Sequence, residues 1–286
     1  MTPPIAKAVI PAGGLGTRML PATLAVPKEM LPVAGVPMIH YAVSEAFGAG
    51  IRRICIVTAP GKRAIAEYFL HRPVEETGVP GGRPAEILAE LALMREEARF
   101  VFIEQTIPRG LGDAVWQTRD FVDGAPFALL LPDNVFTDRT PVISRLIEAW
   151  STEGLDSIAL GRVTAEQALR IGNCGGVRCR PLDPGGEDRP GRCYRIEALQ
   201  DKGQGCYPLE TAHWPYRTAP RHVLGEHFFY YLARQRRDQN GGELDDVPVL
   251  QEIIRRQGLV GVLFDGEVHD TGTPAGYDHA NRSLGR

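Results

Sequence analysis

The chain has 286 residues, of which 43% are hydrophobic and 23% charged, and its formal net charge at pH 7 is −3. This length and apolar content suffice for a substantial core and fit a single α/β domain spanning residues 1–286. The slightly negative charge provides no general attraction to nucleic acid or anionic membranes, so phosphate binding must depend on local cations. No apolar run approaches the roughly 18 residues of a membrane-spanning helix, and the N-terminus lacks a signal-peptide core, which together predict a cytoplasmic protein.

The first predicted element is a short buried strand at residues 8–10, which ends at Pro11 where a glycine-rich turn begins. The turn reads Gly13-Gly14-Leu15-Gly16-Thr17-Arg18. Glycines there let the backbone approach a ligand closely and present N–H donors to it. Arg18 and, ten residues later, Lys28 supply positive charge. The segment therefore predicts a phosphate-binding loop at the carboxyl end of the strand.

Two familiar kinds of phosphate loop do not match this turn. A Walker loop closes with Gly-Lys-Ser/Thr, whereas this turn closes with Gly16-Thr17-Arg18. A Rossmann dinucleotide turn requires an acidic residue about 20 residues later at a strand end. Glu29 is too near and lies inside a proline-bounded segment. Both alternatives are therefore excluded.

Strands and helices alternate through the next hundred residues. Apolar segments predict strands at residues 54–58, 100–103, 127–131 and 158–160. Helical periodicity predicts helices at residues 39–47, 64–70, 87–98, 114–121 and 142–150. This alternation predicts a Rossmann-like α/β fold whose mixed, mainly parallel sheet is flanked by helices. Ligands of such sheets bind beyond the carboxyl ends of the strands.

Two carboxylates follow apolar strands far apart in the sequence. Asp133 follows Leu129-Leu130-Leu131-Pro132, and Asp270 lies in His269-Asp270-Thr271-Gly272-Thr273. A strand-end Asp is often only a turn former. Two of them facing one polyphosphate would, however, provide the oxygen ligands that Mg²⁺ requires. We therefore expect a magnesium site formed by Asp133 and Asp270.

The region from residue 180 to 221 interrupts the alternation, because it is rich in Pro, Gly, Arg and Cys. It predicts a loop-rich insertion near residues 172–222, over the ligand end of the sheet. A C-terminal, mainly helical segment follows at residues 246–286, with helices at 246–257 and 274–284 around a strand at 259–264.

Four of the five cysteines lie close together in the sequence: Cys174, Cys179, Cys193 and Cys206. They raise the alternative of a structural zinc site. No pair has the two-residue gap of common zinc knuckles, so scattered thiols are the favoured interpretation.

The segments at residues 7–11, 15–23 and 27–32 resemble the UTP–glucose-1-phosphate uridylyltransferases, a family of sugar nucleotidyltransferases. The resemblance covers most of the chain and thins between residues 180 and 221. It implies the nucleotide-diphospho-sugar transferase fold and Mg²⁺-dependent transfer of a uridylyl group from UTP to glucose 1-phosphate, which yields UDP-glucose and pyrophosphate. It also implies a homodimer or homotetramer, with no nucleic-acid or membrane partner.

The same resemblance implies roles for individual residues in binding the nucleotide. Gly13 and Gly14 would approach the base and ribose, and Gln105 and Gly110 would contact the pyrimidine. Asp133 and Asp270 would hold Mg²⁺.

Further roles concern the phosphates and the sugar. Arg18 would bind the departing pyrophosphate, and Lys28 would stabilise charge at the α- and β-phosphates. Gly176 and Asp201 would contact the sugar, and Lys202 would hold the sugar phosphate.

Several residues depart from the family pattern. The family has Glu before its sugar-phosphate Lys and Pro after it, whereas this chain reads Gln200-Asp201-Lys202-Gly203. Leu24 replaces a lysine, and Gly175 replaces an aromatic residue. These departures leave open the alternative that the protein is a non-catalytic, nucleotide-binding regulator.

The sequence also leaves open which nucleotide and which sugar 1-phosphate the protein uses. Pro132-Asp133-Asn134 and residues 270–273 resemble the glucose-1-phosphate thymidylyltransferases as well. Thymidylyl transfer, or another nucleotidyl transfer to a different sugar 1-phosphate, therefore remains an alternative.

Overall fold

A computed structural model describes residues 4–71, 81–138, 140–163, 176–187, 189–200, 216–238 and 242–285. Its centre is a nine-stranded sheet. In spatial order the strands are β5 (Arg99–Glu104), β4 (Arg53–Thr58), β1 (Lys7–Pro11), β6 (Phe127–Leu130), β11 (Tyr216–Leu224), β8 (Asp156–Arg162), β12 (Leu259–Leu263), β10 (Cys193–Leu199) and β9 (Gly176–Pro181). Two small antiparallel sheets lie beside it: β7 (Asn134–Phe136) with β13 (Val268–Asp270), and β2 (Pro32–Val33) with β3 (Val36–Pro37).

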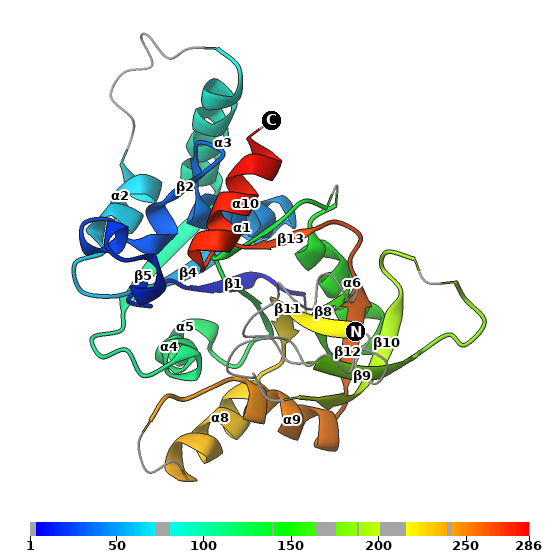
Figure 1. Ribbon diagram of the computed structural model, residues 1–286. Coiled ribbons are helices and arrows are strands. Elements are labelled where there is room, and N and C mark those ends of the chain that lie inside the picture. Colours follow the sequence, from blue (N-terminus) through cyan, green and yellow to red (C-terminus); the bar gives the residue numbers. More distant parts are fainter. Residues whose placement is uncertain are drawn as a thin grey trace.

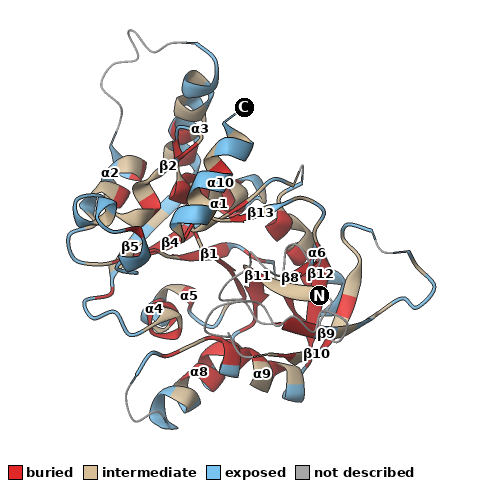
Figure 2. Cartoon of the chain, viewed as in Figure 1, coloured by how far each residue is buried: buried red, intermediate tan, exposed pale blue. Residues whose placement is uncertain are grey.

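The central strands β1 and β6 are buried on both faces, which explains their nearly continuous apolar sequences. Side chains alternate between the faces of a strand. Ala8 and Ile10 accordingly enter one hydrophobic core, whereas Val9 enters the core on the opposite face. Figure 2 shows the buried residues gathered in the strands and on the inner sides of the helices.

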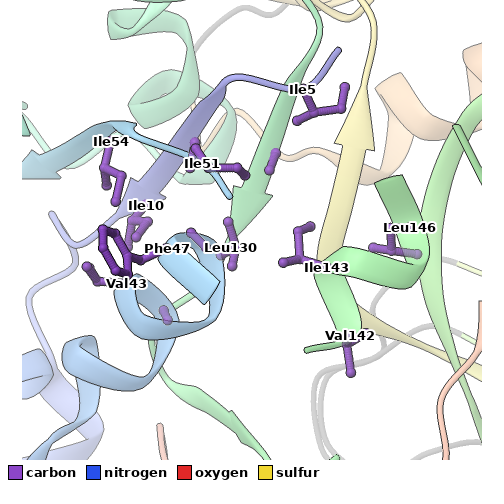
Figure 3. Packing of buried hydrophobic residues seen from close by; sticks show 14 of the residues in the cluster. Ile5, Ile10, Val43, Phe47, Ile51, Ile54, Leu130, Val142, Ile143 and Leu146 are labelled. Carbon is purple, nitrogen blue, oxygen red and sulfur yellow. The ribbon is translucent and has the colours of Figure 1, made fainter. Parts of the chain in front are cut away.

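The helices form a layer on each face of the sheet (Figure 1). One core is lined by residues of α1 (Met38–Gly48), α2 (Arg63–Leu70), α3 (Arg83–Glu97) and α6 (Val142–Glu153). The other is lined by residues of α4 (Leu111–Gln117), α5 (Arg119–Val122), α8 (His227–Asp238) and α9 (Val247–Arg256). Figure 3 shows Val43 and Phe47 of α1 packed beside Ile10 and Leu130, with Ile143 of α6 nearby in the same core.

The last helix and the short helical turns lie outside these two layers. Helix α10 (Pro274–Leu284) packs on the small sheets, where Ala280 joins Val33 and Met38 in a third cluster. Three 3₁₀ turns follow β1: η1 (Thr17–Met19), η2 (Ala22–Leu24) and η3 (Lys28–Met30). Within the described part of the chain, no helix has the length and apolar character that crossing a membrane requires.

The predicted mixed, mainly parallel sheet flanked by helices is confirmed. The pairings imply that all strands of the central sheet except β10 and β11 run in one direction. The four neighbours β5, β4, β1 and β6 are mutually parallel, so their carboxyl ends meet at one edge. The segments that follow these strands are therefore brought together, and they carry most of the predicted site residues.

The expectation of a loop-rich insertion near residues 172–222 is wrong for the described residues of that stretch. They form β9, β10 and the start of β11, and β11 also pairs with β9. This last pairing closes β11, β8, β12, β10 and β9 into a small barrel-like unit at one side of the sheet.

One smaller prediction also needs correction. The single helix expected at residues 114–121 is two helices, α4 and α5, which meet at Thr118. In the C-terminal segment the two predicted helices are present as α9 and α10 and the predicted strand as β12, and β13 is an additional short strand.

Candidate active site

The glycine turn is fixed to the neighbouring strands of the sheet. The backbone N–H of Ala12 donates a hydrogen bond of 2.7 Å to Val57 O, which holds the turn beside β4. A Cβ on Gly13 would lie 2.9 Å from Gln105 Oε1 and 3.3 Å from Thr58 O. A side chain at position 13 would displace the Gln105 amide and crowd Thr58 O, so glycine keeps Gln105 in its place. Gly13 and Gln105, two of the four residues predicted to contact the nucleotide, are therefore neighbours.

Gln105 is held in place by the segment that leads into α4. It is 5% exposed, and its Nε2 donates to Asp113 Oδ2 at 2.7 Å and to Gly110 O at 3.4 Å. Gly110 has φ +93°, and a Cβ there would lie 2.7 Å from Leu244 O. The segment can adopt this turn only with glycine at 110. Gly14, by contrast, faces open space, since nothing lies within 4 Å of where its Cβ would be.

An ion pair between Lys62 and Glu29, which the sequence analysis did not single out, holds the glycine turn in place. Lys62 Nζ donates to Ala12 O at 2.7 Å and to Gly14 O at 2.6 Å, and pairs with Glu29 Oε2 at 2.8 Å. Burial lowers the pKa of Lys62, and the Glu29 carboxylate offsets only part of that effect. The signal was present in the sequence, because Lys62 follows β4 at the same edge of the sheet as the glycine turn.

The turn also closes onto the segment that carries Lys28. Gly16 has φ +66°, and a Cβ there would lie 3.1 Å from both Lys28 Cβ and Thr23 Cγ2. Thr23 Oγ1 donates to Gly16 O at 2.9 Å. Arg18 is exposed on η1, and its positive charge acts to lower the pKa values of Lys28, Asp133 and Asp270. The structure therefore places Arg18 and Lys28 at the same edge.

Lys28 and Asp133 form an ion pair between segments 105 residues apart, with Nζ and Oδ2 2.7 Å from each other. Burial alone would lower the pKa of Lys28, but Asp133 and Glu29 outweigh it and the pKa is raised. Burial likewise opposes the charged form of Asp133. The Lys28 ammonium and the Asn134 amide nevertheless hold the pKa of Asp133 below its usual range. Both side chains are thus charged near neutral pH.

Asp270 lies beside Asp133 because β13 pairs with β7, which places Asp270 opposite Asn134. Thr271 Oγ1 and its backbone N–H both donate to Asp133 O at 2.9 Å, which joins the two strand ends. Burial and then the Asp133 charge raise the pKa of Asp270. The backbone N–H of Gly272, 3.0 Å from Asp270 Oδ1, offsets part of this rise.

The carboxylate pair fits a divalent cation. A Cβ on Gly272 would lie 2.9 Å from Asp133 Oδ2 and 3.1 Å from Asp270 Oδ1, so both carboxylates face one small space. Their mutual repulsion appears in the raised pKa of Asp270, and Lys28 neutralises only one of the two charges. Carboxylate oxygens are the ligands that Mg²⁺ prefers. Asp133 and Asp270 are therefore suited to hold it.

A second residue that the sequence reasoning missed holds the Asp133 loop. Arg221 on β11 is completely buried, and its Nε donates to Glu45 Oε2 at 2.7 Å. Its Nη1 donates to Leu131 O at 2.8 Å and its Nη2 to Asn134 O at 2.9 Å. Arg221 therefore binds the backbone on both sides of Asp133. No sequence pattern indicates it, because a buried arginine is recognised only by its partners.

The strand pairing and hydrogen bond that Gly176 makes among the described residues do not reach this cluster. Gly176 opens β9, where it pairs with Arg217 and its carbonyl accepts a hydrogen bond of 2.9 Å from Gln200 N. Asp201 and Lys202, the other predicted sugar-site residues, lie outside the described residues, as do Cys174 and Cys206. Cys179 and Cys193 are free thiols.

Comparison with known proteins shows the family to which the chain belongs. Residues 7–172 match the family model described as nucleotidyl transferase. The chain is 35% identical over 274 residues to UTP–glucose-1-phosphate uridylyltransferase 2 of Staphylococcus saprophyticus, covering 96% of this chain and 89% of the relative. It is 34% identical over 273 residues to UTP–glucose-1-phosphate uridylyltransferase of Bacillus subtilis, with 96% and 88% covered.

A solved structure shares the whole fold. It is UDP-glucose pyrophosphorylase in complex with UDP-glucose, with a TM-score of 0.82, 26% sequence identity and 98% of both chains covered. A glycine turn, a lysine–carboxylate pair and two adjacent carboxylates at one sheet edge thus occur in a chain similar to UTP–glucose-1-phosphate uridylyltransferases. The chain belongs to the nucleotidyl transferase family, with the UTP–glucose-1-phosphate uridylyltransferases.

Proposed function

We propose that the protein transfers a uridylyl group from UTP to glucose 1-phosphate in the presence of Mg²⁺, giving UDP-glucose and pyrophosphate. The observation that carries the proposal is the cluster of Lys28, Asp133 and Asp270 at the sheet edge that also bears Gly13 and Gln105. The names of the relatives support the choice of substrates.

The reaction in this proposal is direct. A phosphate oxygen of the sugar 1-phosphate attacks the α-phosphorus of UTP in line, and the bond to the β-phosphate oxygen breaks as pyrophosphate leaves. Catalysis of this kind depends on positioning and charge neutralisation. A phosphate monoester is already ionised near neutral pH, so no general base is required.

The cations of the site have distinct roles in this scheme. Lys28 stabilises negative charge at the α- and β-phosphates, and Arg18 binds the departing pyrophosphate. Lys202 holds the incoming sugar phosphate. Gly13 and Gln105 orient the base, and Lys62 keeps the turn in place through Ala12 and Gly14. Mg²⁺, when bound by Asp133 and Asp270, supplies charge that offsets the repulsion between the two anionic substrates.

The test is an assay of pyrophosphate release with purified protein and Mg²⁺. A panel pairs UTP, dTTP and the other nucleoside triphosphates with several sugar 1-phosphates, and UTP with glucose 1-phosphate is expected to react fastest. The absence of pyrophosphate release with every pair would overturn the proposal. Calorimetric binding of UTP without any turnover would instead identify a nucleotide-binding regulator. A preference for dTTP would identify thymidylyl transfer.

A variant of Lys202 tests the sugar half of the site. Lys202→Ala is expected to lose turnover and affinity for the sugar phosphate while UTP binding is largely kept. Equal loss of UTP binding, measured by calorimetry, would show that Lys202 has another role.

We also propose a homodimer or homotetramer, as the family resemblance implies. Light scattering coupled to size-exclusion chromatography measures the mass directly. A monomer at assay concentration would contradict this part of the proposal.

A further inference from the structure

Three side chains with metal-binding atoms converge where β13 meets α10. They are Glu267, His269 and His279, and each offers one ligand atom within 4.8 Å of the other two. The imidazole centroids of His269 and His279 are 5.4 Å apart, and His269 Nε2 lies 3.8 Å from Glu267 Oε2. Ligands of one tetrahedral zinc ion lie about 3.3 Å apart, since each bond is about 2 Å long. Small side-chain rotations would therefore close the site.

His269 gives an independent reason to expect a ligand here. It is 3% exposed, and its Nε2 is buried without a hydrogen-bond partner among the described residues. The nearby Glu267 oxygen, at 3.8 Å, is too distant for a hydrogen bond. Buried polar atoms are nearly always satisfied, so an orphaned ring nitrogen that faces a carboxylate and a second imidazole calls for an explanation. A bound cation provides one.

The cluster is separate from the Asp133–Asp270 pair. Successive side chains of a strand project from opposite faces, so His269 and Asp270 point away from each other on β13. Glu267 and His279 are exposed, which lets an ion enter from solvent. The donor sets also differ, because two imidazoles and one carboxylate suit zinc and similar transition metals, whereas Mg²⁺ prefers oxygen ligands.

We infer that Glu267, His269 and His279 form a second metal site, which binds a divalent transition-metal ion of the zinc class. The ion fixes strand β13 to helix α10 and leaves coordination positions for water. Because it binds the folded chain, its occupancy raises the stability of the protein as the free metal concentration rises. The inference does not depend on the proposed reaction, since it concerns binding alone.

The first test is calorimetric titration of metal-stripped protein with ZnCl₂ in excess MgCl₂, which occupies the oxygen-ligand site. His279→Ala is expected to lose one equivalent of zinc, and Glu267→Gln to bind that zinc about tenfold or more weakly. Both residues are exposed, so both variants are expected to fold, and circular dichroism checks this. His71→Ala, at another exposed histidine, is the matched control and is expected to bind zinc as the wild type does. Unchanged zinc stoichiometry and affinity in His279→Ala would overturn the site.

A second test identifies the ligands directly. Cobalt(II) is expected to give the visible d–d absorption of an imidazole-ligated ion in the wild type and to lose it in His279→Ala. Strong thiolate-to-cobalt charge-transfer bands that persist in His279→Ala would place the ion on cysteines and overturn the assignment. Zinc is expected to raise the melting temperature of the wild type and of His71→Ala, to raise that of Glu267→Gln less at the same zinc concentration, and to leave that of His279→Ala unchanged.

Discussion

Lys28 and Asp133 each provide the charge that the other requires in a half-buried site. Asp133 also faces Asp270, so one carboxylate serves both the lysine and the proposed cation. Asp133→Asn keeps the size of the side chain and removes its charge. We expect the Mg²⁺ concentration for half-maximal activity to rise by at least about 10- to 100-fold, since loss of even a residue that only orients a metal ligand typically weakens metal binding by that factor.

Pyrophosphate release measured over a series of Mg²⁺ concentrations checks this prediction. The matched control is Asp120→Asn, because Asp120 is exposed and pairs only with its neighbour Arg119 among the described residues. It is expected to follow the wild-type curve. A magnesium dependence unchanged in Asp133→Asn would remove Asp133 from the metal site.

Gly272 borders the gap between the two carboxylates. A methyl group at this position would lie 2.9 Å from Asp133 Oδ2 and 3.1 Å from Asp270 Oδ1, so it would displace them or block the ion. In Gly272→Ala, the Mg²⁺ concentration for half-maximal activity is expected to rise about tenfold. Magnesium titration of activity measures the effect, with Gly81→Ala as control because nothing lies within 4 Å of a Cβ there. Equal behaviour of the two variants would mean that the gap holds no ion.

Individual residues differed in how far the sequence revealed them. Asp133 and Gly13 follow apolar strands, and the edge rule for parallel sheets was sufficient to bring them together. Asp270 ends β13, which the antiparallel pairing with β7 places beside Asp133. Lys62 follows the same edge rule and could have been recognised. Arg221 could not, because its place is determined by Glu45 and by two carbonyl groups that only the folded chain brings near.

At the scale of elements, strand β11 carries Arg221 between the carbonyls of Leu131 and Asn134 and the carboxylate of Glu45. Arg221→Met keeps much of the volume but leaves Glu45 buried without its cation. We expect a loss of about 3–5 kcal/mol in the free energy of unfolding, the cost of breaking a buried pair from one side. Urea unfolding measures it.

The double variant Glu45→Gln/Arg221→Met is the control for this prediction. It removes both charges, so it is expected to recover part of the stability lost in Arg221→Met. A double variant no more stable than the single one would show that the arginine acts through the loop carbonyls alone.

The strands in the region expected to be loop-rich show why element prediction failed there. In β9, Val177 is buried whereas Arg178 is exposed, and in β10 Tyr194 and Ile196 are buried whereas Glu197 is exposed. This alternation is the signature of a strand. Arginines in β9 and β10, with Pro and Gly between the two strands, obscured it, and β11 contains both Pro220 and the buried Arg221. Local composition was therefore a poor guide.

At the scale of the whole molecule, alternation of strands and helices was sufficient to predict the mixed sheet, its helical layers and the edge at which the carboxyl ends of β5, β4, β1 and β6 meet. The order of strands could not be predicted in the same way. Strand β11 pairs with β6, placing Arg221 opposite Leu130, and with β9 it closes the barrel-like unit. Such pairings join residues far apart in sequence, so no local pattern records them.

Helices α1 and α3 are tied across one face of the molecule by a polar cluster within an apolar layer. Glu90 on α3 accepts a hydrogen bond from Ser44 on α1 and lies 3.1 Å from His40 Nε2. The hydrogen bond with His40 lowers the pKa of Glu90. Burial acts in the opposite direction, and the hydrogen bond from Ser44 lowers the pKa further. A carboxyl group whose pKa is lower in the folded state stabilises the protein above its unfolded pKa. That stabilisation disappears as the pH falls through the folded pKa.

Glu90→Gln is therefore expected to be less stable than the wild type at pH 7, and the difference is expected to shrink as the pH is lowered below about 4.3, the usual pKa of Glu. Urea midpoints measured from pH 7 to the lowest pH at which the wild type is folded test this. Glu86→Gln, on the same helix, is expected to match the wild type throughout because Glu86 is exposed. A stability difference for Glu90→Gln that stays constant with pH would mean that its carboxylate stabilises the protein by packing rather than by its charge.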